Sequence, residues 1–312
     1  MERDHQGDRL QGVAAGRGDA RQTMSDPQPS FHPSPRKPGL RLPPGACDAH
    51  VHVFGPRSIF PFAENRTFTP ADAPKERLFE LHAMLGIERC VIVQSACHGF
   101  DNAAVADALA AKNGAYRGVA LLPTTVGDAE LRRLDGLGFC GVRFNYMKHL
   151  GQGASIEDVI ALGSRLAPLG WHLQIHLDSS LIEEMTPWLR RSAVPVVIDH
   201  MGRVDASLGL DQPAFRQLLG LMRDERFLLK VSCVERISRR DPPYDDAIPF
   251  ARTLVAEFGD RTLWGTDWPH PNVAGGVPDD GLLVDLLAEI APSAAQRQAL
   301  LVDNPQRFYR FA

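Results

Sequence analysis

The feature that most constrains the fold of this chain is a repeated alternation of short apolar segments with amphipathic segments. Each apolar run has the length of a β-strand, and the runs lie at 46–54, 89–95, 116–122, 140–146, 172–178, 194–202, 227–233 and 262–269. A stretch with apolar residues at helical spacing follows each run, at 75–86, 101–113, 127–136, 155–169, 179–191, 212–224, 243–258 and 280–291. Eight strands alternating with eight helices over about 250 residues is typical of a (β/α)8 barrel. We therefore predict a single α/β domain, a distorted TIM barrel formed by residues 46–312.

The alternative architecture is a doubly wound open sheet. That fold requires a glycine-rich phosphate-binding turn after the first strand, and the sequence "HVHVFGPR" is not one. Residues 1–45 are rich in Gly, Arg, Asp, Ser and Pro and show no hydrophobic period, so we expect a flexible, disordered leader. Either Met1 or Met24 can be the start, because residues 24–45 already provide a run-in to the first strand.

Composition excludes several classes of protein. The chain is 44% hydrophobic and 23% charged with a net charge of −4, and its basic residues are not clustered, so no nucleic-acid partner is expected. It has no apolar run long enough to cross a membrane and no signal-peptide core, so we expect a cytoplasmic protein. The five cysteines are scattered without a C-x-x-C motif and are expected to be reduced, buried thiols. The sequence does not indicate an oligomeric state.

Two histidines lie one residue apart in the first predicted strand, in "CDAHVHVFGP". Side chains at positions i and i+2 of a strand point to the same face, so His50 and His52 should share one space, with Ala49, Val51 and Val53 on the other face. Two interpretations are open at this point. The pair is either a set of hydrogen-bonded core histidines or half of a metal or catalytic site.

The active site of a TIM barrel lies at the carboxyl ends of its strands. Polar residues occupy these ends in the later strands: Ser95 and His98, Arg143 and Asn145, His176, Asp199 and His200, and Asp267. Several imidazoles gathered with a carboxylate in one mouth must each find a partner, which favours a functional site over a structural one. No G-x-S-x-G motif surrounds Ser95, so we interpret it as a hydrogen-bond donor to a substrate rather than a nucleophile.

A family resemblance is carried by five segments that follow one another along the chain: "DAHVHVFGP", "VIVQSACHGFDN", "GVRFN", "VIDHMGR" and "WGTDWPHPN". They are similar to the amidohydrolase superfamily, and within it to the 2-pyrone-4,6-dicarboxylate lactonases. The resemblance implies hydrolysis of a small carboxylated lactone, that dicarboxylate or a close analogue, in the catabolism of aromatic acids. It also implies that Asp267 activates the attacking water.

The same resemblance suggests roles for other residues. His50, His52 and His200 would join Asp267 as catalytic residues, with His200 polarising the carbonyl. Arg143 and Arg236 would hold carboxylates, because a guanidinium pairs with a carboxylate in a bidentate way. The remaining predicted substrate-binding residues are Ser95, His98, Asn145, His149 and His270.

The chain departs from the lactonase pattern at two positions. The fifth strand carries His176 where those lactonases have a tyrosine, and "GVRFNYMKH" ends in His149 where they have an arginine. Relatives with a strand-5 histidine use zinc, so the resemblance implies a tentative divalent metal site of His50, His52, His176 and Asp267. A metal-free mechanism is the close alternative for the cofactor. A metal-dependent decarboxylase of an aromatic acid is the alternative for the function.

Overall fold

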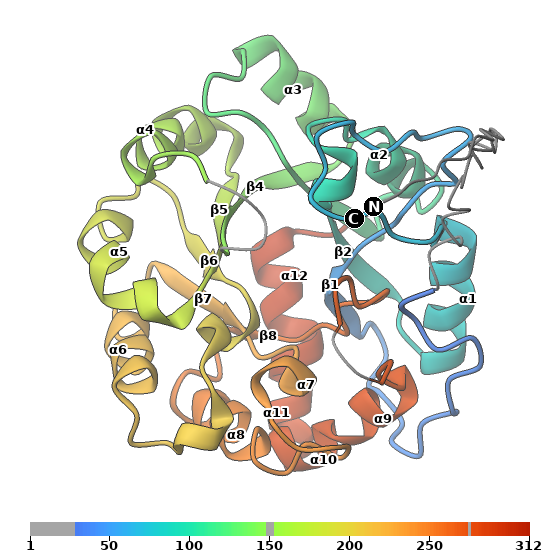
Figure 1. The fold of residues 1–312 in the computed structure, drawn as a ribbon, viewed down its shortest axis with the longest axis vertical. Helices are drawn as coiled ribbons and strands as arrows, with labels where there is room; N and C mark the ends of the chain where they lie inside the picture. Colours follow the sequence, from blue (N-terminus) through green and yellow to red (C-terminus); the bar gives the residue numbers. More distant parts are fainter. Residues whose placement is uncertain (1–28, 148–152, 274–275) are drawn as a thin grey trace, which may run out of the picture.

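The computed structural model describes residues 29–147, 153–273 and 276–312, and it confirms the predicted barrel (Figure 1). Within these residues, parallel strands follow one another around the sheet in sequence order. The strands are β1 (Cys47–Val51), β2 (Arg89–Val93), β3 (Tyr116–Ala120), β4 (Phe139–Tyr146), β5 (His172–Leu177), β6 (Val196–Ile198), β7 (Phe227–Lys230) and β8 (Thr262–Leu263).

Helices surround this ring of strands, as Figure 1 shows. Those between strands are α1 (Lys75–Leu85), α2 (Ala103–Ala110), α3 (Asp128–Gly136), α4 (Ile156–Leu166), α5 (Ile182–Leu189), α6 (Pro213–Met222), α7 (Val234–Ile237) and α8 (Ile248–Glu257). Those after β8 are α9 (Asp280–Asp285), α10 (Leu287–Ile290), α11 (Ala294–Gln298) and α12 (Asn304–Tyr309). The predicted helix at 280–291 is thus two short helices, and α7, α11 and α12 were not predicted.

Local capping explains where two of the helices begin. The Ser155 side chain accepts a hydrogen bond from the backbone N–H of Asp158 at the start of α4. Asp279 does the same for the first N–H groups of α9, which confirms the helix start predicted at this acidic turn. Each cap satisfies a backbone donor that the first helical turn leaves without a partner.

Backbone hydrogen bonds between β1 and the segment after β8 complete the barrel. The Ala49 N–H donates to the carbonyl of Trp264 at 2.8 Å, and the Asp267 N–H donates to the carbonyl of His50 at 2.8 Å. Gly265 lies in this seam, where a Cβ atom would come within 2.5 Å of the His50 nitrogen. The predicted strand at 262–269 is therefore regular only at its start, and its remaining residues form the seam that brings Asp267 beside His50.

Alternation along the strands separates an outer apolar layer from the barrel interior. Val51 and Val53 belong to the larger apolar cluster, as predicted, but Ala49 belongs to a smaller one with Val91 and Val197. The prediction for Ala49 was wrong because the β1–β2 pairing shifts register between Asp48 and Val51. Such a shift reverses the face of the residues beyond it.

The end of the chain packs against the barrel at the amino ends of its strands. Tyr309 and Phe311 join the smaller apolar cluster, and the Arg117 guanidinium donates to the Tyr309 carbonyl at 3.1 Å. In Figure 1 helix α12 lies across the middle of the ring of strands. This segment therefore fills the end of the barrel opposite to the one where the polar residues gather.

Residues 29–45 of the predicted leader contain no helix or strand and lie against α9 and the segment after β8. The Leu40 N–H donates to Asp285 at 2.8 Å, and the Phe31 ring lies 5.2 Å from that of Trp268. The first 28 residues are outside the described part of the chain, and the division at residue 45 stays a prediction. All five cysteines are buried and unpaired, as expected. None of the helices in the described ranges has the length and apolar character needed to span a bilayer.

Candidate active site

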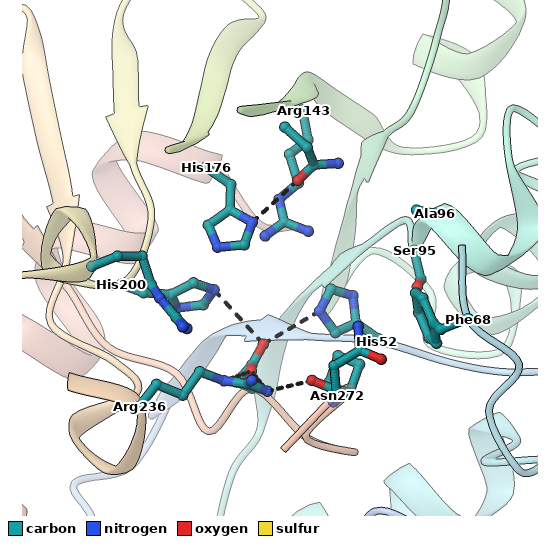
Figure 2. Close-up of a pocket in the computed structure, with 13 residues that line it drawn as sticks. His52, Phe68, Ser95, Ala96, Arg143, His176, His200, Arg236 and Asn272 are labelled. Carbon is teal, nitrogen blue, oxygen red and sulfur yellow. Dashed lines mark hydrogen bonds and ion pairs between the residues drawn. The ribbon is translucent and has the colours of Figure 1, made fainter. Parts of the chain in front are cut away.

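The carboxyl ends of the strands surround one polar pocket, which encloses about 560 Å³ including its open mouth. Figure 2 shows side chains from several strands facing this space. The residues that line it include His52, Phe68, Ser95, Arg143, Asn145, His176, His200, Arg203, Arg236, Asp267 and Asn272.

Asp267 lies at the base of the pocket with both carboxylate oxygens directed at cationic or imidazole groups. Its Oδ1 atom lies 3.5 Å from His50 Nε2, 3.3 Å from His52 Nε2 and 3.8 Å from His200 Nε2. Its Oδ2 atom accepts a hydrogen bond from Arg236 Nε at 2.9 Å. Burial by itself would raise the pKa of Asp267, but the Arg236 guanidinium is the largest opposing cause, and this pKa is held well below its usual range. The carboxylate is therefore ionised at neutral pH and can accept a proton.

The hydrogen bonds of two histidines limit where their protons lie. His52 Nδ1 lies 2.7 Å from the carbonyl oxygen of Val93, which only accepts, so Nδ1 is the donor. The Nε2 atom that faces Asp267 then carries a lone pair unless the ring is charged. His200 Nδ1 lies 2.9 Å from Ser232 Oγ and 3.0 Å from Cys233 Sγ. Burial keeps the pKa of His200 well below its usual value, so this ring is neutral.

A layer of buried charged groups lies beneath the histidines. Arg143 Nε donates to Asp199 Oδ2 at 2.8 Å, and Gln174 Nε2 donates to the same oxygen at 3.1 Å. Lys230 Nζ lies 2.8 Å from Gln174 Oε1, 3.2 Å from His50 Nδ1 and 3.6 Å from Asp199 Oδ1. Burial lowers the pKa of Lys230 to about 8, and burial together with the Lys230 charge lowers the pKa of His50 to about 3. His50 is therefore a neutral imidazole.

His176 lines the pocket but does not join the cluster around Asp267. Its Nδ1 atom lies 3.2 Å from Asn145 Oδ1, its Nε2 atom has no partner among the described residues, and its ring lies 5.3 Å from that of His200. The predicted alternation holds here, because Gln174 faces the interior while Ile175 is in the outer cluster.

Three of the four predicted metal ligands converge. His50, His52 and Asp267 place one potential ligand atom each within 4.8 Å of one another, whereas His176 is in no such group among the described residues. Imidazole nitrogens and a carboxylate oxygen suit a divalent cation such as zinc, and the unpartnered Nε2 of His50 is buried and faces this cluster. These buried residues could therefore hold a metal.

Three guanidinium groups line the pocket, one more than the sequence analysis singled out. Arg143 and Arg236 both line the pocket, and each is paired with a protein carboxylate, so their role as carboxylate-binding residues stays a prediction. Arg203 was missed, and its guanidinium has no hydrogen bond or ion pair within the described residues. The signal was present in the quoted segment "VIDHMGR", where a charged residue follows the sixth strand.

The turn His200–Arg203 places two of these pocket residues. His200, Met201, Gly202 and Arg203 all have positive φ angles, between 51° and 60°. Non-glycine residues adopt this left-handed backbone at a cost, and such residues concentrate at functional sites. The tight reversal brings both His200 and Arg203 to the pocket immediately after β6.

Other predicted residues occupy different positions. His98 is outside this pocket, where its Nε2 atom accepts from the Gly55 N–H at 3.2 Å and its Nδ1 atom lies 3.1 Å from the Pro61 carbonyl. His270 is buried and lies 3.1 Å from Asp280. Ser95 and Asn145 line the pocket. His149 is outside the described residues.

Lys230 is the second residue that the sequence analysis missed. It is the single charged residue in the apolar strand "FLLKVSC", and alternation places it on the same face as Leu228 and Ser232. A charge within a buried strand needs a partner, and this was the available signal for its role.

Comparison with known proteins identifies the class. The model of the amidohydrolase family, Amidohydro_2, matches residues 47–311, so the chain belongs to this family. It is 46% identical over 288 residues to a 2-pyrone-4,6-dicarboxylate hydrolase of Comamonas testosteroni, a match that covers 89% of this chain and 94% of that protein. It is 39% identical over 287 residues to a 4-sulfomuconolactone hydrolase of Hydrogenophaga intermedia, covering 90% and 93%.

A solved structure gives the same result for the fold. A Pseudomonas putida protein assigned as a 2-pyrone-4,6-dicarboxylic acid hydrolase superposes with a TM-score of 0.73 and 32% identity, covering 87% of this chain and 99% of that one. The family resemblance inferred from the five segments is therefore confirmed. Both curated relatives are hydrolases of lactones by name.

Proposed function

We propose that this protein hydrolyses a small lactone that carries two acidic groups, 2-pyrone-4,6-dicarboxylate or a close analogue. The observation that carries the proposal is the composition of the pocket, in which three guanidinium groups surround an ionised carboxylate and neutral imidazoles. Three fixed cations suit a dianionic substrate, because each can form a charge-assisted hydrogen bond to an acidic group. The two lactone hydrolases at 46% and 39% identity support the same substrate class.

In this mechanism Asp267 accepts a proton from the water that attacks the lactone carbonyl. Its Oδ2 atom is held by Arg236, which leaves Oδ1 directed toward the imidazoles. His200 donates from Nε2 to the carbonyl oxygen as negative charge develops there, provided that its Nδ1 accepts from Ser232. A positioned donor of this kind typically contributes 10²–10³-fold to the rate, on the order of 3 kcal/mol.

The arginines position the substrate. Arg203 has its whole guanidinium available for an acidic group, whereas Arg236 shares its charge with Asp267. A substrate carboxylate that draws Arg236 away would weaken its hold on Asp267 and make that carboxylate more basic. Substrate binding and activation of the base are coupled in this way.

A bound divalent cation would be held by His50, His52 and Asp267, and it would supply a water of lowered pKa and polarisation of the carbonyl. The same three ligands are the feature that would favour the second candidate, a metal-dependent decarboxylase of an aromatic acid. Identification of the products separates the two, because a lactonase opens the ring with release of a proton and a decarboxylase releases carbon dioxide.

The test is a product assay on the purified protein with the Asp267→Asn variant beside it. We expect ring opening of 2-pyrone-4,6-dicarboxylate without carbon dioxide release, and a loss of about 10²–10⁴-fold in kcat for Asp267→Asn with substrate still bound. Asp128→Asn, which alters an exposed carboxylate on α3, is the control and should retain full activity. Carbon dioxide release, or an Asp267→Asn variant with more than about a tenth of the activity, would contradict the proposal.

A further inference from the structure

We propose that Lys230 is a positioning residue that fixes His50 as the tautomer with its proton on Nε2, and thereby weakens the binding of a divalent cation by His50, His52 and Asp267. The inference concerns the protonation pattern of the site, and it holds whichever substrate the enzyme uses.

Lys230 is completely buried at the end of β7, with three acceptors close to its Nζ atom. Gln174 Oε1 is at 2.8 Å, His50 Nδ1 at 3.2 Å and Asp199 Oδ1 at 3.6 Å. An ammonium group carries three N–H donors and no acceptor. Gln174 Oε1 and His50 Nδ1 are within hydrogen-bond distance of this donor, and Asp199 Oδ1 is an ion-pair neighbour.

The orientation of Gln174 agrees with this assignment. Its Nε2 atom donates to Asp199 Oδ2 at 3.1 Å, so its Oε1 atom is the one that faces Lys230. Asp199 Oδ2 also accepts from Arg143, whereas Asp199 Oδ1 lies 3.6 Å from Lys230 Nζ and 3.3 Å from His50 Nδ1 without a hydrogen bond to a described residue. Both polar atoms of Gln174 are thus paired, and the hydrogen bond that His50 Nδ1 makes is the one with Lys230.

The consequence falls on the imidazole of His50. A ring nitrogen that accepts a hydrogen bond carries no proton, so when Nδ1 accepts from Lys230 the single proton of the neutral ring is on Nε2. That nitrogen faces Asp267 Oδ1 at 3.5 Å, so the proton of His50 lies on the side of the ring that faces the carboxylate. A metal ion requires a lone pair at the same atom. With Lys230 in place, the cation is left with His52 and Asp267 as ready ligands.

Removing the ammonium should reverse this tautomer. His50 Nδ1 also lies 3.3 Å from Asp199 Oδ1, and without Lys230 it can donate its proton to that oxygen. The lone pair would then be on Nε2, facing His52 and Asp267. A carboxylate that accepts from the far nitrogen of a metal-bound histidine is the usual support of such ligands, and changes to it alter metal affinity about 10- to 100-fold.

The first experiment examines the unaltered protein. Nitrogen-15 NMR of histidine-labelled protein, with His50 assigned by comparison with His50→Gln, reports which ring nitrogen carries the proton. We expect an unprotonated Nδ1 and a protonated Nε2 for His50. The opposite pattern, with the proton on Nδ1, would overturn the inference. This NMR experiment does not need a folded variant of Lys230.

The second experiment measures affinity for Co²⁺, whose visible absorption reports its coordination by protein ligands. Lys230→Met should bind Co²⁺ about 10- to 100-fold more tightly than the unaltered protein. Lys37→Met, which removes an exposed lysine, should leave the affinity unchanged. Adding His50→Gln to Lys230→Met should abolish the gain.

Equal Co²⁺ affinity with and without Lys230, or a gain that survives the loss of His50, would contradict the proposal. Circular dichroism checks that each variant is folded. If Lys230→Met is not, Lys230→Gln takes its place, because it removes the charge and keeps a polar group in the cavity. Neither readout depends on turnover, so a failure here is distinct from a failure of the proposed lactonase activity.

Discussion

At the scale of single residues, the three arginines of the pocket differ in what they are free to do. Arg143 is bound to Asp199 and Arg236 to Asp267, so replacing either one also strands a buried carboxylate. Such a change mixes loss of substrate binding with loss of stability. Arg203 has no protein partner in the described part of the chain and is the cleaner probe of substrate charge.

We therefore predict that Arg203→Met raises KM for a dianionic lactone about 10- to 100-fold, the worth of a hydrogen bond between charged groups. The unfolding midpoint should change little, because no ion pair is broken. Steady-state kinetics on the diacid and on each of its two monoesters give the measurement, with Arg133→Met on the outer face of α3 as the control. Equal losses on the diacid and on both of its monoesters would mean that Arg203 does not bind an acidic group.

At the scale of elements, the seam between β1 and the segment after β8 places the central carboxylate. The backbone bonds of this seam place Asp267 beside His50 and His52. Gly265 permits the close approach, since an added Cβ would be 2.5 Å from the His50 nitrogen and 2.8 Å from an oxygen of Asp48. Both neighbours belong to the buried first strand and cannot move aside easily.

Gly265→Ala should therefore destabilise the protein by about 2 kcal/mol or more, as overpacking of a tight interior does, and should also lower kcat. Gly220→Ala in α6 is the matched control, because nothing lies within 4 Å of an added Cβ there. Alanine in a helix interior should stabilise by about 0.5–1 kcal/mol. Urea unfolding of both variants tests the difference, and equal midpoints would show that the seam can open to accept a methyl group.

At the scale of the whole molecule, buried neutral histidines link stability to pH. Burial, followed by the charge of Lys230, lowers the pKa of His172 to about 3, and the pKa values of His50, His176 and His200 are lowered too. Between about pH 6.5 and pH 3 the unfolded chain binds protons at these sites and the folded chain does not. Stability from these groups is therefore complete above pH 6.5 and falls as the pH falls.

His172 allows this linkage to be measured away from the pocket, because its ring packs against Phe308 and Tyr309. We predict that His172→Gln lowers the slope of the unfolding free energy against pH between pH 6 and pH 4.5. The decrease should be about 1.4 kcal/mol per pH unit, the slope expected when unfolding binds one proton. Urea titrations at several pH values give both slopes. Parallel lines for the two proteins would show that His172 is protonated in the folded state.

The sequence by itself determined the architecture and most of the pocket. Apolar runs of strand length that alternate with amphipathic runs of helix length favour a (β/α)8 barrel. In that fold, polar residues at the carboxyl ends of the strands lie together at one end of the barrel. The residues of this set that line the pocket each lie in a strand or within a few residues of one, and the apolar neighbours in the strand set its phase: His52, Arg143, His176, His200, Arg236 and Asp267.

Only the tertiary structure decided how these residues pair. Local backbone geometry sets two of these features, the register shift in β1 that turns Ala49 inward and the positive φ angles that direct Arg203 into the pocket. The third, the contact of Lys230 with His50, joins segments that are distant in sequence. His98 follows β2 and its ring nitrogens lie against the backbone of the β1–α1 loop, and its contact with a substrate stays a prediction. Periodicity indicates which face of a strand or helix a side chain occupies. Its hydrogen-bond or ion-pair partner is determined only when the closed barrel brings distant segments together.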